Sequence, residues 1–179
     1  MSPESYLALA VREFRRLKKL SDDAMAQCPD DQFFAAPGPG DNSVAVLVKH
    51  MAGNLVSRFA HFLTSDGEKP DRDRDAEFEI LPADTRASLT AAWERGWNLL
   101  FTELGALTDA DLGRTVTIRG EPLTVLQALN RQLMHYAYHA GQVVYVAKHF
   151  RGGAWKTLSI PRGGSAAFNQ SPATYLSNR

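Results

Sequence analysis

The sequence has almost no cysteine, no excess of either charge and no long apolar run. Among its 179 residues Cys28 is the one cysteine, which excludes an intramolecular disulfide framework. The 20 basic residues balance the 20 acidic ones, so the composition does not favour a nucleic-acid or membrane-surface partner. No run of about 18 apolar residues is present to span a bilayer.

The beginning of the sequence also lacks the features of a signal peptide. Residues 1–14, MSPESYLALAVREF, have neither a basic region nor an apolar core of the required length. Together with the lone cysteine, this absence leads us to expect a cytoplasmic protein. Hydrophobic residues make up 44% and charged residues 22% of the chain, values that are typical of globular proteins. We expect one domain over residues 1–179.

Four stretches have the apolar periodicity of helices, and segments rich in glycine, proline and charge separate them. The predicted helices cover about residues 3–27, 43–65, 84–105 and 125–150. Ser2 is the expected cap and Pro3 the first residue of the first helix. Thr124 and Gln127 have the spacing of a capping box before the fourth. The sequence therefore predicts an all-α four-helix bundle.

The remaining segments are expected to be loops, with one short extended piece at residues 114–119. The charged segment 66–82 should fold against the body through Phe78, Ile80 and Leu81. The tail, residues 151–179, is expected to be mostly irregular. Four apolar residues could anchor it, on the bundle or on a partner subunit: Trp155, Ile160, Phe168 and Tyr175.

Histidines mark the candidate site. His135 and His139 are four residues apart, which places them on one face of the fourth helix, at a spacing that suits two imidazoles sharing one metal ion. On the second helix, His50 lies on a similar polar stripe beside an apolar one. If the two stripes face each other, three imidazoles converge and leave a fourth position open, as in catalytic metal sites. Asn54 and Gln142 lie on the same stripes and could orient the rings or a substrate.

The other two histidines fit this site poorly. His61 shares the stripe of His50 but lies about 16 Å further along a helix axis, at 1.5 Å per residue. His149 falls in the last turn of the fourth helix, where a cation is favourable for the dipole. The glutamate of a His-Glu-x-x-His zinc-protease motif is missing, and no Asp or Glu lies on either histidine stripe. The lack of an Asp or Glu on these stripes argues against hydrolysis, because no general base would be present to activate water.

A plainer interpretation stays open at this point. Polar stripes beside apolar ones also describe ordinary amphipathic helices with surface histidines. In that case the protein would be a bundle without a bound metal.

Two segments resemble a known family. They are SVAVLVKHMAGN, with His50, and RGEPLTVLQALNRQLMHYAYHAGQ, with His135 and His139, in this order. The chain is similar to the DinB/YfiT-like superfamily of metalloenzymes, and within it to an uncharacterised bacterial branch. The resemblance covers nearly the whole chain. It implies an up-down-down-up four-helix bundle, usually dimeric, with a divalent metal held by His50, His135 and His139.

Two functions follow from the residues and the resemblance together. The first is a divalent-metal-dependent enzyme acting on a small molecule, with Zn, Ni or Fe as the ion and a low-molecular-weight thiol as a candidate co-substrate. A thiol-dependent transferase fits better than a hydrolase, and Arg131, Asn54 and Gln142 are the candidates for catalytic or substrate-binding roles. The second is a non-catalytic, stress-related bundle that binds a metal or another ligand. In either case we expect a homodimer.

Overall fold

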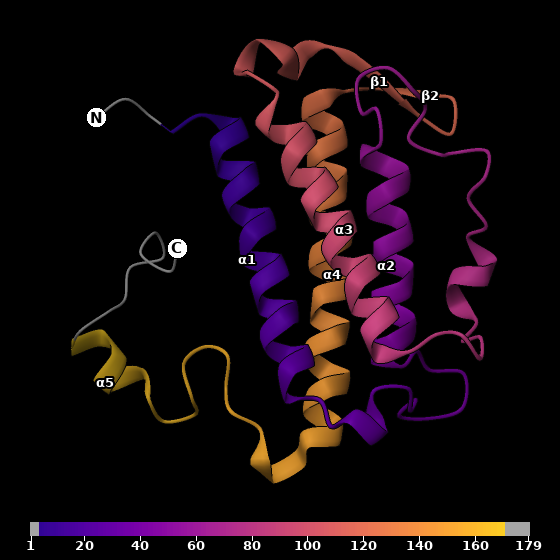
Figure 1. Cartoon of the computed structure of the whole chain (residues 1–179). Helices are drawn as coiled ribbons and strands as arrows, with labels where there is room; N and C mark the ends of the chain where they lie inside the picture. The colour runs from indigo at the N-terminus through magenta and orange to yellow at the C-terminus, as the bar shows by residue number, and fades with distance from the viewer. Residues whose placement is uncertain (1–3, 171–179) are drawn as a thin grey trace.

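Four long α-helices make up most of residues 4–170, which are the residues that a computed structural model describes (Figure 1). The mostly helical prediction is confirmed. The helices are α1 (Tyr6–Gln27), α2 (Val44–Phe59), α3 (Arg86–Gly105), α4 (Val125–Arg151) and the short α5 (Ser165–Gln170). Two strands, β1 (Thr115–Ile118) and β2 (Glu121–Thr124), form a small antiparallel sheet. Single 3₁₀ turns occur at Asp30–Gln32, Asp75–Phe78, Asp109–Gly113 and Gly152–Ala154.

Hydroxyl side chains cap each of the long helices. The cap residues Ser5, Ser43, Thr85 and Thr124 each accept a hydrogen bond from the backbone N–H three residues on. The capping box of Thr124 and Gln127 is thus confirmed. The predicted start of the first helix is wrong, because Ser5 is the cap and the helix begins at Tyr6; Ser2 and Pro3 lie outside the described residues.

The second helix is shorter than its sequence pattern predicts. It ends at Phe59 instead of residue 65, because Ala60 is extended and His61 has a φ of 53°. A side chain rarely adopts that left-handed conformation inside a helix. His61 is therefore exposed at a turn and does not continue the stripe that contains His50.

The apolar stripes of the four long helices meet in one core. α2 packs mainly on α3, and α1 mainly on α4. Trp93, Trp97 and Tyr136 are fully buried there, so the tryptophan pair belongs to the core. Gly96 lets α2 and α3 approach closely, because a Cβ at this position would lie only 2.9 Å from the Cβ of Leu55.

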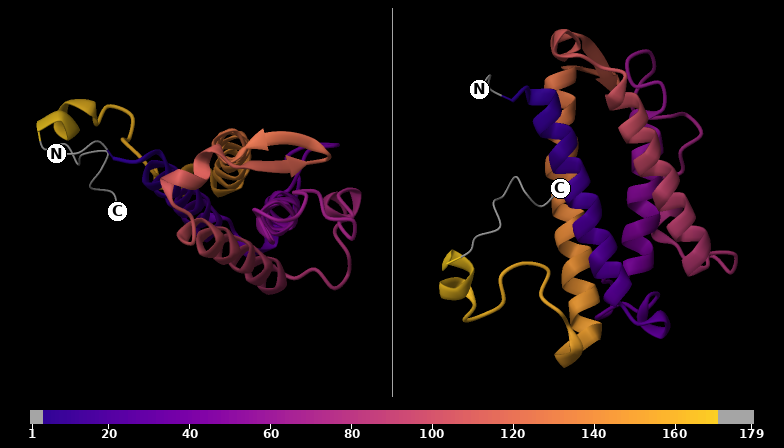
Figure 2. Two further views of the ribbon diagram at one scale, coloured as in Figure 1. Left: turned by 90° about the horizontal axis from the view of Figure 1, so that it is seen from above. Right: turned by 60° about the vertical axis from the view of Figure 1, so that its left-hand side comes forward.

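The connection between α2 and α3 returns along the outside of the bundle, beside α2 and away from α1 (Figures 1 and 2). Glu77 is buried in this segment and Phe78 is half-buried, whereas Ile80 and Leu81 are exposed. The expected folding of the segment against the body is therefore confirmed for Phe78 and wrong for the other two residues. This connection brings acidic and aromatic side chains onto α2.

The β1–β2 hairpin lies across one end of the bundle (Figure 2). Its two-residue turn consists of Arg119 and Gly120, both with positive φ, at 58° and 73°. The carboxylate of Asp66 accepts hydrogen bonds from the backbone N–H groups of Glu68, Arg119 and Gly120 at 2.7–2.8 Å. These backbone bonds lower the pKa of Asp66 to about 2. The extended piece predicted at residues 114–119 is confirmed, whereas the second strand was not predicted.

Part of the tail is anchored at the end of α1. Trp155 and Leu158 pack against the core, and the backbone N–H and C=O of Lys156 pair with the side-chain amide of Gln27. Ile160 is exposed and Phe168 is half-buried in α5, a helix that the irregular tail prediction missed. Tyr175 lies outside the described residues. None of the helices within residues 4–170 is long and apolar enough to cross a membrane.

Candidate metal centre

The structure brings His50 of α2 together with His135 and His139 of α4. One ring nitrogen of each imidazole lies within 4.8 Å of the others, and the Nε2 atoms of His135 and His139 are 3.0 Å apart. His50 and His139 are buried, and His135 is half-buried. The two polar stripes therefore do face each other, and within residues 4–170 these three side chains could hold one metal ion.

Hydrogen bonds fix the orientation of two of the rings. Nδ1 of His50 lies 2.8 Å from Oε2 of Glu77, and Nδ1 of His139 lies 2.8 Å from Oε1 of Gln142. An acceptor opposite Nδ1 favours the tautomer with its proton on Nδ1, which leaves the lone pair of Nε2 free. In His50 and His139 that lone pair is on the nitrogen away from Glu77 and Gln142, and in His139 it faces Nε2 of His135 at 3.0 Å, where a shared ion would lie between the two rings.

This donor set fits a divalent cation. Tetrahedral coordination with Zn–N bonds of 2.0–2.1 Å requires roughly 3.3–3.4 Å between neighbouring nitrogens. The observed separations bracket that spacing: the Nε2 atoms of His135 and His139 are 3.0 Å apart, and all three ligand atoms lie within 4.8 Å of one another, so side-chain adjustments of about 1 Å would bring them to it. Neutral imidazole ligands suit Zn, Ni, Cu or Fe, so the ligand type does not choose among them.

Burial keeps two of the imidazoles in the neutral form that binds metals. Desolvation, reinforced by the neighbouring His139 and His50 and by Arg58 and Arg72, lowers the pKa of His135 to about 3. Desolvation likewise lowers the pKa of His139, although the bond to Gln142 acts in the opposite direction. Both rings are therefore neutral at pH 7 and need lose no proton to coordinate a cation.

Glu77 is the carboxylate that the sequence analysis missed. Burial raises its pKa, but the hydrogen bonds from His50 and Arg72 outweigh this effect and lower it overall, so the group is ionised. Arg72 donates to both carboxylate oxygens, at 2.8 and 2.9 Å. Gly53 makes room for this group, because a Cβ there would lie 2.2 Å from Oε1 of Glu77. Phe78, the next residue, lies against the imidazole of His50 with 4.8 Å between ring centroids.

The other predicted residues have different positions. Gln142 orients His139, as the sequence suggested. Asn54 is buried and accepts a hydrogen bond from the hydroxyl of Tyr136 at 3.1 Å, so its carboxamide oxygen orients a tyrosine instead of a histidine. Arg131 is exposed one turn before His135 and lies 3.4 Å from Glu121. His149 is exposed in the last turn of α4, as expected.

A pocket of about 440 Å³ opens beside the three histidines. Asn54, Gln132, Tyr138 and Gln142 line it together with five arginines. Gln132 is buried, and its carboxamide oxygen has no hydrogen-bond partner within residues 4–170. The wall of this pocket is thus polar and rich in positive charge.

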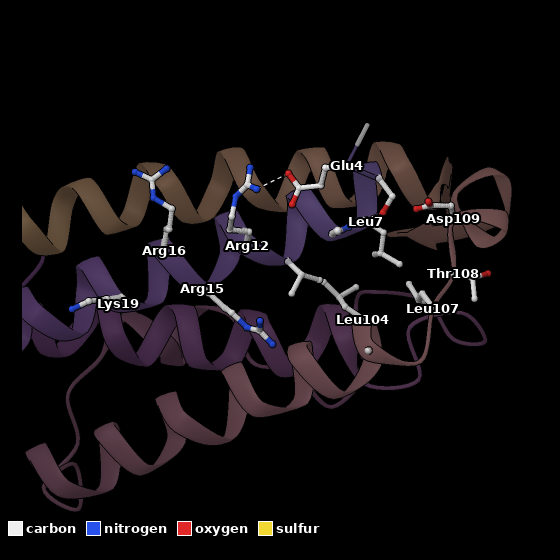
Figure 3. A pocket seen from close by; sticks show the side chains of 14 residues that line it. Glu4, Leu7, Arg12, Arg15, Arg16, Lys19, Leu104, Leu107, Thr108 and Asp109 are labelled. Carbon is white, nitrogen blue, oxygen red and sulfur yellow. Dashed lines mark hydrogen bonds and ion pairs between the residues drawn. The ribbon is translucent and has the colours of Figure 1, made fainter. Parts of the chain in front are cut away.

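A larger groove, of about 690 Å³, lies elsewhere, between the first half of α1 and the end of α3 (Figure 3). Its floor contains Leu7 and Leu104, and its rim is basic. Arg12 on that rim pairs with Glu4, and Lys19 pairs with Asp23. No histidine or cysteine lines this groove, whereas His50, His135 and His139 line the smaller pocket.

The fold and the site can now be compared with known proteins. The family model "Protein of unknown function (DUF1572)" matches residues 2–164. The chain belongs to the DUF1572 family. A comparison of this DUF1572 protein with functionally curated proteins gives no match. Among solved structures it is similar to the "conserved protein of locus from Enterococcus faecalis", with a TM-score of 0.60 and 17% identity over 82% of this chain and 97% of that chain. At this identity the similarity concerns the fold alone.

Proposed function

We propose that this DUF1572 protein is a divalent-metal-dependent enzyme of the DinB/YfiT-like superfamily. The observation that carries the proposal is the convergence of His50, His135 and His139, whose ligand atoms lie within 4.8 Å of one another. The connection that returns beside α2 supports the up-down-down-up helix order of that superfamily. A homodimer in the cytoplasm is part of the same proposal.

The chain supplies the surroundings of the ion. Glu77 and Gln142 hold His50 and His139 with their Nε2 atoms free, and the apolar face of Phe78 shields one side of His50. When bound, a divalent ion with an open position supplies a Lewis acid that favours the deprotonated form of a thiol or of water. The neighbouring pocket admits a small molecule to that side.

Transfer to or from a thiol fits these surroundings better than hydrolysis. Among the described residues no carboxylate lines the pocket, and Glu77, the nearby acidic group, is already bound to His50 and Arg72. A general base for water is thus missing, whereas a thiol that binds as thiolate needs none. The lack of a general base also favours the alternative function, a non-catalytic module that binds a metal or another ligand.

The metal site can be tested by replacing one ligand. We expect His135→Ala to lose at least half of the bound metal in elemental analysis of protein purified without a histidine tag. His149→Ala is the matched control, because His149 is exposed on the same helix. Metal content equal to that of the wild type in His135→Ala would contradict the proposal.

Removal of the metal separates the enzyme from the binding module. We expect a chelator to lower the melting temperature of the wild type more than that of His135→Ala, because the folded wild type gains more binding energy from the ion. Metal-dependent turnover in a screen of thiols with electrophiles would favour the enzyme. Stabilisation by metal without turnover for any thiol would favour the module.

A further inference from the structure

Five arginines line the pocket beside the histidines: Arg58, Arg72, Arg74, Arg119 and Arg131. They come from α2, from the connection that follows it, from the hairpin turn and from α4. Among residues 4–170 no Asp or Glu shares the lining with them. Four separate parts of the chain thus direct positive charge to one place.

The two inner arginines are buried and fully occupied by protein partners. Arg58 lies 3.0 Å from Glu68 and also donates to the carbonyl oxygen of Gly67. Arg72 binds both carboxylate oxygens of Glu77. These two residues maintain the shape of the wall and contribute to its positive potential.

The three outer arginines, Arg74, Arg119 and Arg131, are much more exposed than the inner two. Their side chains are 50%, 54% and 45% exposed. The acidic partners of Arg74 and Arg131 are exposed residues at 3.6 and 3.4 Å. Arg119 shares Glu68 with Arg58 and Arg72. The exposed pairs of Arg74 and Arg131 contribute little, so these two guanidinium groups are available to a ligand, and that of Arg74 also lies 5.0 Å over the ring of Phe78. Arg119 uses Nε for a 3.0 Å bond to Glu68.

The hairpin places Arg119 at the pocket against the preference of its own backbone. A two-residue turn with positive φ at both positions favours Asn-Gly, and an arginine there is disfavoured. Asp66 compensates by accepting the backbone N–H of Arg119 at 2.8 Å. Although asparagine would suit the turn better, the arginine both reaches the pocket and donates from Nε to Glu68 at 3.0 Å, which ties the hairpin to the connection after α2.

We propose that this arginine wall binds the anionic group, a carboxylate or a phosphate, of a small molecule whose other end faces the three histidines. The planar guanidinium fork matches both anions. Arg131 lies one helical turn before His135, with their Cβ atoms about 5–6 Å apart, so a small molecule can reach both residues at once. The inference rests on the proposed function for the role of the histidines, but anion binding itself requires only the arginines.

The test is calorimetric titration with succinate and with inorganic phosphate, using both metal-loaded and chelator-treated protein at physiological ionic strength. Succinamide, which has the same length without the charge, is the ligand control. The variants are Arg131→Gln and Arg119→Asn, the second chosen because its turn is expected to fold well. Arg114→Gln is the control variant, since Arg114 is also half-exposed with a single acidic partner but does not line the pocket.

We expect each pocket variant to bind at least one of the two anions about tenfold more weakly, as for the loss of one charge-assisted hydrogen bond, with no change in metal content. The control variant should bind like the wild type, and succinamide should not bind. The anion that binds more tightly identifies the carboxylate or the phosphate class.

The outcomes distinguish this inference from the proposed function. Arginine-dependent anion binding in protein that takes up no metal would support the inference and contradict the metalloenzyme. The inference would be overturned if the wild-type protein bound neither anion, whatever its metal content. It would also be overturned if the pocket variants bound both anions as tightly as the wild type does. An equal loss in Arg114→Gln would also overturn it, because the effect would then come from net charge.

Discussion

At the scale of single residues, Glu77 connects the histidine cluster to the arginines. Its carboxylate accepts from the imidazole of His50 on one side and from the guanidinium of Arg72 on the other. The group is buried, so each partner depends on it more than a surface residue would. Both the orientation of His50 and the neutralisation of a buried cation therefore depend on this one side chain.

Glu77→Gln tests that double role. The amide keeps the size of the side chain but cannot neutralise Arg72 and accepts less strongly from His50. We expect the affinity for Zn²⁺ to fall about 10–100-fold, as for other hydrogen-bond partners of metal ligands. The free energy of unfolding should fall by about 1–3 kcal/mol. Competition with a zinc-binding dye and urea unfolding measure the two effects.

The neighbouring Glu79→Gln is the control for this prediction, because Glu79 is exposed. Glu79→Gln should leave both the affinity for Zn²⁺ and the free energy of unfolding equal to those of the wild type within experimental error. If Glu77→Gln lowers stability but binds Zn²⁺ with wild-type affinity, then Glu77 serves Arg72 alone and does not orient His50 for the metal.

The residues of the site differ in how far the sequence could predict them. His50, His135 and His139 lie on regular helices, where spacing fixes the face, and so their convergence could be predicted. Glu77 lies in a connection without periodicity, and its contact with His50, 27 residues away, left no pattern. Asn54 was on the correct stripe but lies one turn beyond His50, where Tyr136 binds it.

At the scale of elements, the close contact of α2 and α3 sets the position of the helix that carries His50. Gly96 is buried where the two helices touch, and a Cβ there would lie 2.9 Å from Leu55 Cβ and 3.3 Å from the carbonyl oxygen of Ala52. Gly141 on α4 is exposed, and a Cβ there would meet nothing within 4 Å. Gly96 and Gly141 thus have opposite surroundings.

Replacing each of them with alanine should therefore change stability in opposite directions. Alanine favours a helix over glycine by about 1 kcal/mol, and Gly141→Ala should gain most of that in the single chain. Gly141 lies on the same exposed face of α4 as Tyr138 and Tyr145, so the two variants are compared at concentrations where the protein is monomeric. Gly96→Ala should lose about 1–3 kcal/mol, because overpacking against backbone and Cβ atoms outweighs the propensity. Urea unfolding of both variants, side by side, measures the difference. Equal stabilisation of the two would show that the helices can separate at little cost.

The elements themselves were largely predictable, and their ends were less so. The four long helices carry clear apolar stripes and hydroxyl caps, which are local signals. The end of α2 was misplaced because the apolar pattern continues through Phe62, whereas His61 already has a left-handed backbone. The strand at residues 121–124 contains Pro122 and lacks alternation, so only its pairing with residues 115–118 reveals it.

At the scale of the whole molecule, α4 presents a second face opposite the core. Met134, Tyr138 and Tyr145 are 75%, 64% and 70% exposed. Their spacing places them within about 40° of one another around the helix. Three large apolar side chains in a row on one exposed face are typical of an interaction surface. They favour the proposed homodimer, with α4 packing on its counterpart around a two-fold axis.

Introducing negative charge on this face tests the dimer. In a two-fold interface each substitution faces its own copy or a close neighbour, so Met134→Glu and Tyr145→Glu should place like charges together. We expect the wild type to be a dimer and the double variant a monomer in light scattering after size exclusion. Leu81→Glu is the control, since Leu81 is half-exposed in the connection before α3. A monomeric wild type at all concentrations would contradict the proposed dimer.

The same experiment links assembly to the site. Tyr138 belongs to the exposed face and also lines the histidine pocket, with its ring 5.0 Å from that of His139. A partner that covers Tyr138 would also narrow the mouth of the pocket and exclude water from it. The monomeric double variant should therefore keep the three histidines and bind metal, but hold succinate or phosphate more weakly than the dimer does. Equal anion affinity in monomer and dimer would show that each chain forms its pocket alone.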